Sequence, residues 1–188
     1  GSSLNISIAI VPCPVATALS SKGWIKSVKN HVDLKSGFAF KDGDSLDVAI
    51  HAYTNDQATL DITHNKGIYA RRGRACAANI VPASTGAASA IGKVIPSLDG
   101  KIVGKAFRVP VPDGSMIDLT LELAKNVTKD ELNNLFITNQ NATLKVSNDP
   151  IVSSDCIGKK CGAIVDLLST DVISFGDTCL AKVVAWYD

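Results

Sequence analysis

The chain has 188 residues, of which 46% are hydrophobic and 20% charged, a composition that excludes an intrinsically disordered or collagen-like protein. Nineteen basic side chains balance eighteen acidic ones, so the net charge of +1 favours neither nucleic acid nor an anionic membrane as a partner. The length suits one domain, and no G-x-G-x-x-G fingerprint follows a predicted strand, so we expect no dinucleotide-binding fold within it.

The first part of the chain predicts one strand and one helix. Gly1 and Ser2 have the character of a cloning scar and are set aside. Residues 5–11 alternate and are β-branched, which predicts a strand. Pro14 suits the first turn of a helix over residues 14–32, because the N–H that proline lacks would have no partner there. No apolar run in the chain is long and unbroken enough to span a membrane.

The remaining sequence predicts several strands with few helices between them. Strands are expected over 46–53, 102–109, 115–123, 151–157, 162–167 and 179–186, and short helices over 87–95 and 128–138. The capping-box pattern Thr128-Lys-Asp-Glu131 marks the start of the second helix. Residues 35–45 and 54–74 read as loops, the second of a length that often carries function. Because strands and helices do not strictly alternate, we predict an α+β fold with a mixed, largely antiparallel sheet and helices packed on one face.

The number and spacing of the cysteines indicate the cellular compartment and whether a metal site is expected. There are five, an odd number without the spacing of a disulfide framework, so we predict a reducing, cytoplasmic setting. Cys76, Cys156, Cys161 and Cys179 are interpreted as free buried thiols. No histidine or second cysteine pair follows Cys156 and Cys161 at a zinc spacing, so no metal site is predicted.

Two residues are candidates for acid–base or nucleophilic chemistry. Cys13 lies at the predicted strand-to-helix turn, where unpaired N–H groups and the helix dipole lower the pKa of a thiol. The alternative is a small apolar side chain that fills the turn. His51 ends a predicted strand, where it is either a buried core histidine or a general base with a pKa near neutrality.

Other residues are candidates for holding an anion. Thr85 and Gly86 precede a predicted helix, where hydroxyl and N–H donors can meet an anion or simply cap the helix. Arg108 offers a fork of donors for phosphate, unless it pairs with Asp118 or Asp155. A run of basic side chains in the loop 54–74 is either a solvated surface or part of a packing interface; it consists of Arg71, Arg72 and Arg74.

Seven short phrases from Leu46 onward match one protein family in order and at close to its spacing. They are His51-Ala-Tyr-Thr54, Arg74-Ala-Cys-Ala-Ala-Asn-Ile-Val-Pro82, Ser84-Thr-Gly-Ala-Ala88, Gly92-Lys-Val-Ile-Pro96, Ala106-Phe-Arg-Val-Pro110, Val152-Ser-Ser-Asp155 and Trp186-Tyr-Asp188. The chain therefore resembles the catalytic, C-terminal domain of glyceraldehyde-3-phosphate dehydrogenase. The resemblance is strong over 46–188 and weak over 3–45, and it implies one domain over 3–188 without an NAD-binding domain.

The resemblance implies a phosphorylating dehydrogenase of glycolysis that works through a cysteine thioester. Cys13 would attack the aldehyde, His51 would remove the hydroxyl proton, hydride would pass to NAD, and phosphate would cleave the thioester. The residues implied to hold the phosphates of a small phosphorylated aldehyde and inorganic phosphate are Thr54, Thr85, Gly86 and Arg108. Because NAD would bind elsewhere, this chain alone is expected to be inactive as a dehydrogenase. The resemblance also implies a homo-oligomer or a partner NAD-binding domain.

The cysteine motif departs from the family and leaves two other functions open. The Ser-Cys-Thr-Thr-Asn-Cys phrase of the family is absent, and Pro12 and Pro14 flank Cys13 instead. One alternative is a non-catalytic, pseudoenzyme domain used for assembly or interaction. The other is an NAD-independent thiol hydrolase of acyl compounds, which needs only Cys13, His51 and an anion pocket.

Overall fold

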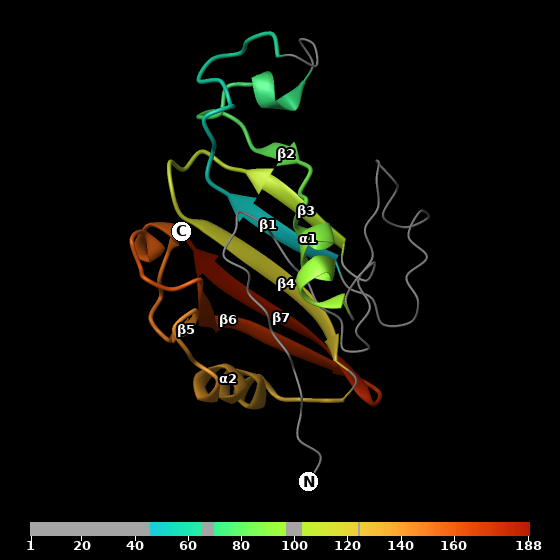
Figure 1. Cartoon of the computed structure of the whole chain (residues 1–188). Helices are drawn as coiled ribbons and strands as arrows, with labels where there is room; N and C mark the ends of the chain where they lie inside the picture. The colour runs from blue at the N-terminus through green and yellow to red at the C-terminus, as the bar shows by residue number, and fades with distance from the viewer. Residues whose placement is uncertain (1–45, 65–69, 97–102, 124) are drawn as a thin grey trace.

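The computed structural model describes residues 46–64, 70–96, 103–123 and 125–188, so the strand and helix predicted before residue 46 lie outside the described residues. Within these residues the chain forms one seven-stranded sheet in the order β2-β3-β1-β4-β7-β6-β5 (Figure 1). The strands are β1 (Leu46–His51), β2 (Val81–Ala83), β3 (Val103–Arg108), β4 (Ser115–Leu123), β5 (Leu144–Ser147), β6 (Ala163–Phe175) and β7 (Thr178–Tyr187). The helices are α1 (Ala87–Val94) and α2 (Lys129–Thr138), with short 3₁₀ turns η1 (Arg71–Gly73) and η3 (Ser153–Cys156).

The sheet is mixed and largely antiparallel, as the sequence predicted. The antiparallel pairs are β1–β4, β2–β3, β4–β7 and β6–β7, and the parallel pairs are β1–β3 and β5–β6. Since β4 runs against β1 and β7 runs against β4, strands β1, β3 and β7 all point the same way. Their last residues therefore lie at one edge of the sheet, where β4 begins (Figure 1).

The core is built from alternate residues of the neighbouring central strands β4 and β7. Alternate residues of β4, from Ile117 to Leu123, are buried, and the buried residues of β7 lie opposite them. Side chains from both helices join the same apolar cluster: Ile91 from α1, and Leu132 and Phe136 from α2. Phe136 is 2% exposed, so burial of this one side chain contributes about 2–3 kcal/mol to stability.

The start of α2 confirms the predicted capping box. The Thr128 hydroxyl accepts a hydrogen bond from the Glu131 N–H at 3.1 Å, and the Glu131 carboxylate accepts one from the Thr128 N–H at 2.7 Å. These hydrogen bonds satisfy two N–H groups that the helix leaves unpaired. The hydrogen bond from the Thr128 N–H, together with one that the Thr128 hydroxyl donates at 3.0 Å, lowers the pKa of the exposed Glu131 carboxyl.

The strand predicted over 151–157 is wrong, because this segment closes into the turn η3. The Asp155 carboxylate accepts from the Val152 N–H at 2.8 Å, and the Asp155 N–H donates to the Val152 carbonyl at 2.9 Å. A side chain that caps its own backbone in this way competes with strand pairing. Strands β2 and β5 were not predicted, since three and four residues are too few to show a period. No helix among the described residues is both long and apolar enough to cross a membrane.

Candidate functional site

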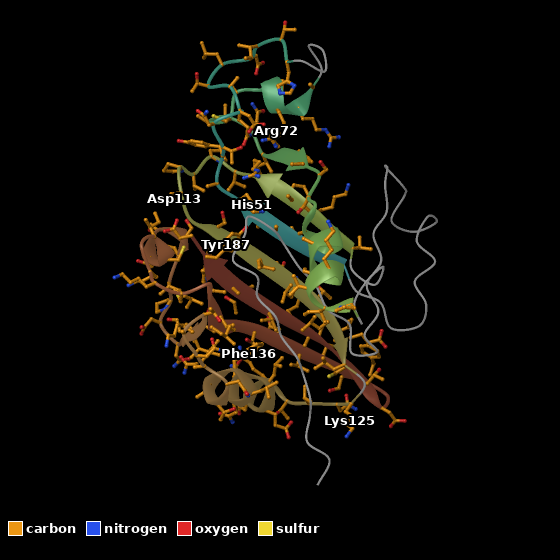
Figure 2. All side chains as sticks on the ribbon, in the orientation of Figure 1. His51, Arg72, Asp113, Lys125, Phe136 and Tyr187 are labelled. Carbon is orange, nitrogen blue, oxygen red and sulfur yellow. The ribbon has the colours of Figure 1, made fainter. Side chains whose placement is uncertain are left out.

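Four residues converge at the edge where β1, β3 and β7 end. His51 is the last residue of β1 and Arg108 the last of β3, and the two are register partners. Ser115 begins β4 opposite Tyr187, the last residue of β7. A cavity of about 380 Å³ opens among them and is also lined by Thr54. Figure 2 shows His51 and Tyr187 at this edge, with Arg72 in the loop beyond the strand ends.

His51 is buried and held by a tyrosine. Its side chain is 2% exposed, and the Tyr187 hydroxyl oxygen lies 2.8 Å from Nδ1 and 3.1 Å from Nε2. Burial, aided by the positive charge of Arg108, lowers the pKa of His51 from 6.5 to about 4. The imidazole is therefore neutral near pH 7 and can accept a proton.

Arg108 presents a positive charge to the cavity with part of its hydrogen-bonding capacity unused. One terminal nitrogen, Nη1, donates to the Ala52 carbonyl at 3.0 Å, whereas Nε is buried without a partner among the described residues. Burial lowers the pKa of Arg108, and the neighbouring charge of Arg72 acts in the same direction. Two guanidinium groups that destabilise each other, one with a free donor, form a place where an anion would be stabilised.

Arg72 connects this cavity to the loop that follows β1. Its guanidinium forms a two-pronged ion pair with Asp56, and Nη2 also donates to the Thr54 hydroxyl at 3.0 Å. The Thr54 hydroxyl in turn donates to Asp56 at 2.6 Å. Hydrogen bonding from Arg72 is the main reason why the pKa of Asp56 falls to about 2. The loop therefore keeps a fixed cation beside Thr54.

Comparison with known proteins identifies the family of this chain. A family model described as "Glyceraldehyde 3-phosphate dehydrogenase, C-terminal domain" matches residues 26–188. The chain belongs to this family. It is 49% identical over 155 residues to the glyceraldehyde-3-phosphate dehydrogenase of Streptococcus pyogenes, and equally so to that of Streptococcus pyogenes serotype M1. Each match covers 82% of this chain and 45% of the relative, so the chain spans about half the length of these curated dehydrogenases.

The structure gathers some of the predicted site residues and leaves others apart. His51, Thr54 and Arg108 line the same cavity. Thr85 and Gly86 are not among the residues that line it; the Thr85 hydroxyl accepts from the Ala87 N–H at 3.2 Å, and Gly86 is the N-cap residue of α1. Cys13 lies outside the described residues, so its distance from His51 stays a prediction.

The partners considered for Arg108 in the sequence are engaged elsewhere. Asp118 forms an ion pair with Lys182, its diagonal neighbour on β7, and Asp155 caps the turn η3. Neither carboxylate neutralises Arg108. No ion pair of Arg108 is found in the part of the chain that the structure describes, so its charge is available to the cavity.

Three site residues were missed or misjudged from the sequence. Arg72 read as one member of a basic run, and only the fold shows that it reaches Thr54. Tyr187 was part of a matching phrase but carried no assigned role. Cys161 was predicted to be buried; it is half-buried and lines the cavity, whereas Cys76, Cys156 and Cys179 are confirmed as free and buried. The complementary charges of Asp56 and Arg72 were the one signal that could have joined the loop to the site.

Proposed function

We propose that this chain is the substrate-binding catalytic half of a phosphorylating glyceraldehyde-3-phosphate dehydrogenase that acts in glycolysis, in the cytoplasm. The observation that carries the proposal is the cavity in which a buried, neutral histidine, His51, lies beside the partly unpaired guanidinium of Arg108. Membership of the family supports the same reading. The substrate class is a small phosphorylated aldehyde, together with inorganic phosphate.

The two arginines and Thr54 suit the phosphate groups of these compounds. A phosphate oxygen can accept from Arg108 Nε, which has no partner among the described residues. The Thr54 hydroxyl accepts from Arg72 and donates its one hydrogen to Asp56, so it would bind a phosphate oxygen by turning this hydrogen from Asp56 to the ligand. A bound dianion would also relieve the repulsion between Arg72 and Arg108. Thr85 and Gly86, at the start of α1, complete the proposed anion-binding set on the strength of the resemblance.

His51 suits the role of the base that works with a thiol. A neutral imidazole can take the proton of the Cys13 thiol, and the thiolate formed would favour the imidazolium and raise the pKa of His51. The thiolate would then attack the aldehyde carbon, and the imidazolium would give its proton to the oxygen to form the hydroxyl of the adduct. The imidazole, neutral again, would take that hydroxyl proton when the adduct is oxidised. Phosphate held by Arg108 would cleave the thioester that follows oxidation.

The residues that the structure describes do not fit NAD. The crossover between the parallel strands β1 and β3 contains α1, which begins after Ser84-Thr-Gly86 and not after the glycine-rich turn that approaches a dinucleotide pyrophosphate. NAD, which would accept the hydride, is therefore assigned to a separate nucleotide-binding domain. We expect this chain alone to show no dehydrogenase activity.

A homo-oligomer fits the sheet. Since side chains of α1 and α2 join one cluster, we infer that both helices cover one face. On the other face the alternate residues of β4 and β7 are only half-buried and include Met116 and Trp186. The family associates through the outer face of this domain, and a second copy would bury these apolar side chains.

The rate of Cys13 alkylation against pH tests the proposal. We expect a thiol pKa below the ordinary value of about 8.5, returning to that value in His51→Ala. Tyr53→Phe, a change at another residue that lines the cavity, is the matched control and should leave the profile unchanged. A slow Cys13 with an ordinary pKa in the wild type would contradict the catalytic role and favour a domain used for assembly. Steady hydrolysis of a thioester without NAD would select the thiol hydrolase.

A further inference from the structure

A second cavity lies beside the edge strand β5, where β5 runs along β6 (Figure 1). Its volume of about 560 Å³ is within the usual range of small-molecule sites. Three lysines line it: Lys145 from β5, and Lys159 and Lys160 from the segment that leads into β6. We propose that this lysine groove binds a small organic dianion, at a site separate from Arg108. The inference goes beyond the proposed function and does not depend on it.

The two segments that carry the lysines are tied together through the backbone. The Thr143 carbonyl accepts from the Gly162 N–H at 2.8 Å and from the Ala163 N–H at 2.9 Å. These hydrogen bonds join the start of β5 to the start of β6. Lys145 lies two residues after Thr143, and Lys160 lies two residues before Gly162. The backbone positions of the lysines are therefore fixed relative to each other.

The segment before β6 is also held by its own hydrogen bonds. The Lys159 N–H donates to the Cys156 carbonyl at 3.1 Å, and the Cys161 N–H donates to the Lys159 carbonyl at 2.9 Å. The backbone is thus arranged before a ligand binds. Only the lysine side chains would have to become ordered, which limits the entropy cost of binding.

Positive charge in the groove is not neutralised by ion pairs. None of the three lysines forms an ion pair within the part of the chain that the structure describes. Two carboxylates, Asp149 and Asp155, line the same groove, so positive side chains outnumber negative ones by three to two. The Asp155 carboxylate also accepts from the Val152 N–H at 2.8 Å as the cap of η3. Ammonium groups gathered in one cavity repel each other, and a dianion would relieve this repulsion.

Other side chains of the groove suit an organic ligand with an anionic end. Ser147 follows Lys145 by two residues in β5, so both side chains lie on the same face of the strand. The Ser147 oxygen accepts from the Asp149 N–H at 3.1 Å, and its own hydrogen can turn to a ligand. Ile151 and Ile164 line the groove and would contact a short carbon chain. A phosphate monoester and a dicarboxylate share this chemistry.

Backbone amide shifts of the ¹⁵N-labelled full chain at pH 7.5 test the proposal, with ethyl phosphate and succinate as separate probes. We expect saturable shifts at Lys145, Lys159 and Lys160 with at least one probe, and the probe that binds more tightly identifies the ligand class. Lys145→Gln and Lys160→Gln should each weaken binding about two- to fivefold, whereas Asp149→Asn should tighten it. The matched control is Lys105→Gln, an exposed lysine of β3, which should leave the affinity unchanged.

Three results would overturn the proposal. The first is a set of shifts that sodium chloride reproduces at the same ionic strength. The second is equal weakening by Lys160→Gln and by the control Lys105→Gln. The third is a response confined to Ala52 and Thr54, which line the cavity of His51; it would leave the proposed function standing. An ordinary Cys13 in the alkylation test would, conversely, leave the lysine groove standing. Because the substituted side chains are exposed, these variants keep the core intact.

Discussion

Burial of His51 should make the stability of the chain depend on pH. The pKa of this histidine is about 4 in the folded state, against 6.5 when it is exposed to water. Below pH 6.5 the unfolded chain therefore takes up a proton that the folded chain does not, so stability falls as the pH falls and levels off below about 4. Integrated over the range, the folded chain loses about 2 kcal/mol between pH 7 and pH 5.

Urea unfolding at pH 7 and pH 5 measures this loss in a Cys13→Ala background, where no thiolate raises the pKa of His51, with and without the His51→Gln variant. The variant loses the hydrogen bond to Tyr187 at both pH values, but it has no group at position 51 that titrates. We expect the difference in unfolding free energy between the two pH values to be about 2 kcal/mol smaller in the variant. Asp56, whose pKa is about 2 in the folded state, weakens the fold only as the pH drops below its ordinary 3.8, outside this range. Equal pH dependence in both proteins would refute the assignment of a buried neutral imidazole.

Three further predictions concern the fold. Gly114 has a φ of 78°, and an added Cβ would lie 2.3 Å from the Ser153 carbonyl oxygen, so Gly114→Ala should cost about 2–4 kcal/mol. Gly158→Ala, at a φ of 72° but in open space, should cost about 1–2 kcal/mol; equal costs would contradict the close approach. Thr128→Ala removes the capping box and should cost about 1 kcal/mol, and no loss in urea unfolding would show that the cap is not formed. Phe136→Ala should cost about 3–5 kcal/mol, and a cost below 1 would place this ring outside the core.

Regular patterns in the sequence predicted most of the sheet. Alternation along 115–123 and 179–186 was clear because β4 and β7 each bury one face. β6 was predicted only over 162–167, yet it continues to Phe175. The Asp166 carboxylate, which accepts from the Leu168 and Ser169 N–H groups, produces a register irregularity at this point. When a polar side chain hydrogen-bonds to nearby backbone N–H groups, the strand becomes irregular and the alternation of its side chains is interrupted. The sequence pattern therefore did not show that the strand continues.

The sequence predicted only those residues of the candidate site that stand in a recognisable local pattern. His51 and Arg108 stood out because each ends a strand within a matching phrase, and the parallel pairing of β1 with β3 makes them neighbours. In the sequence, Arg72 lies 21 residues from His51 and Tyr187 lies 136 residues from it. No local sequence pattern relates either residue to His51. Contacts of this range come from the strand order, which a single sequence does not show.

Acylation of Cys13 by an acyl phosphate tests the central claim most directly, because this half-reaction needs no NAD. The thiolate sulfur bonds to the acyl carbon, the bond from that carbon to the phosphate oxygen breaks, and phosphate leaves with the electron pair. Mass spectrometry of the digested chain after incubation with acetyl phosphate locates the acyl group. We expect it on Cys13, ahead of the half-buried Cys161, with loss in His51→Ala. No thioester, or labelling that follows cysteine exposure alone and ignores His51, would contradict the account.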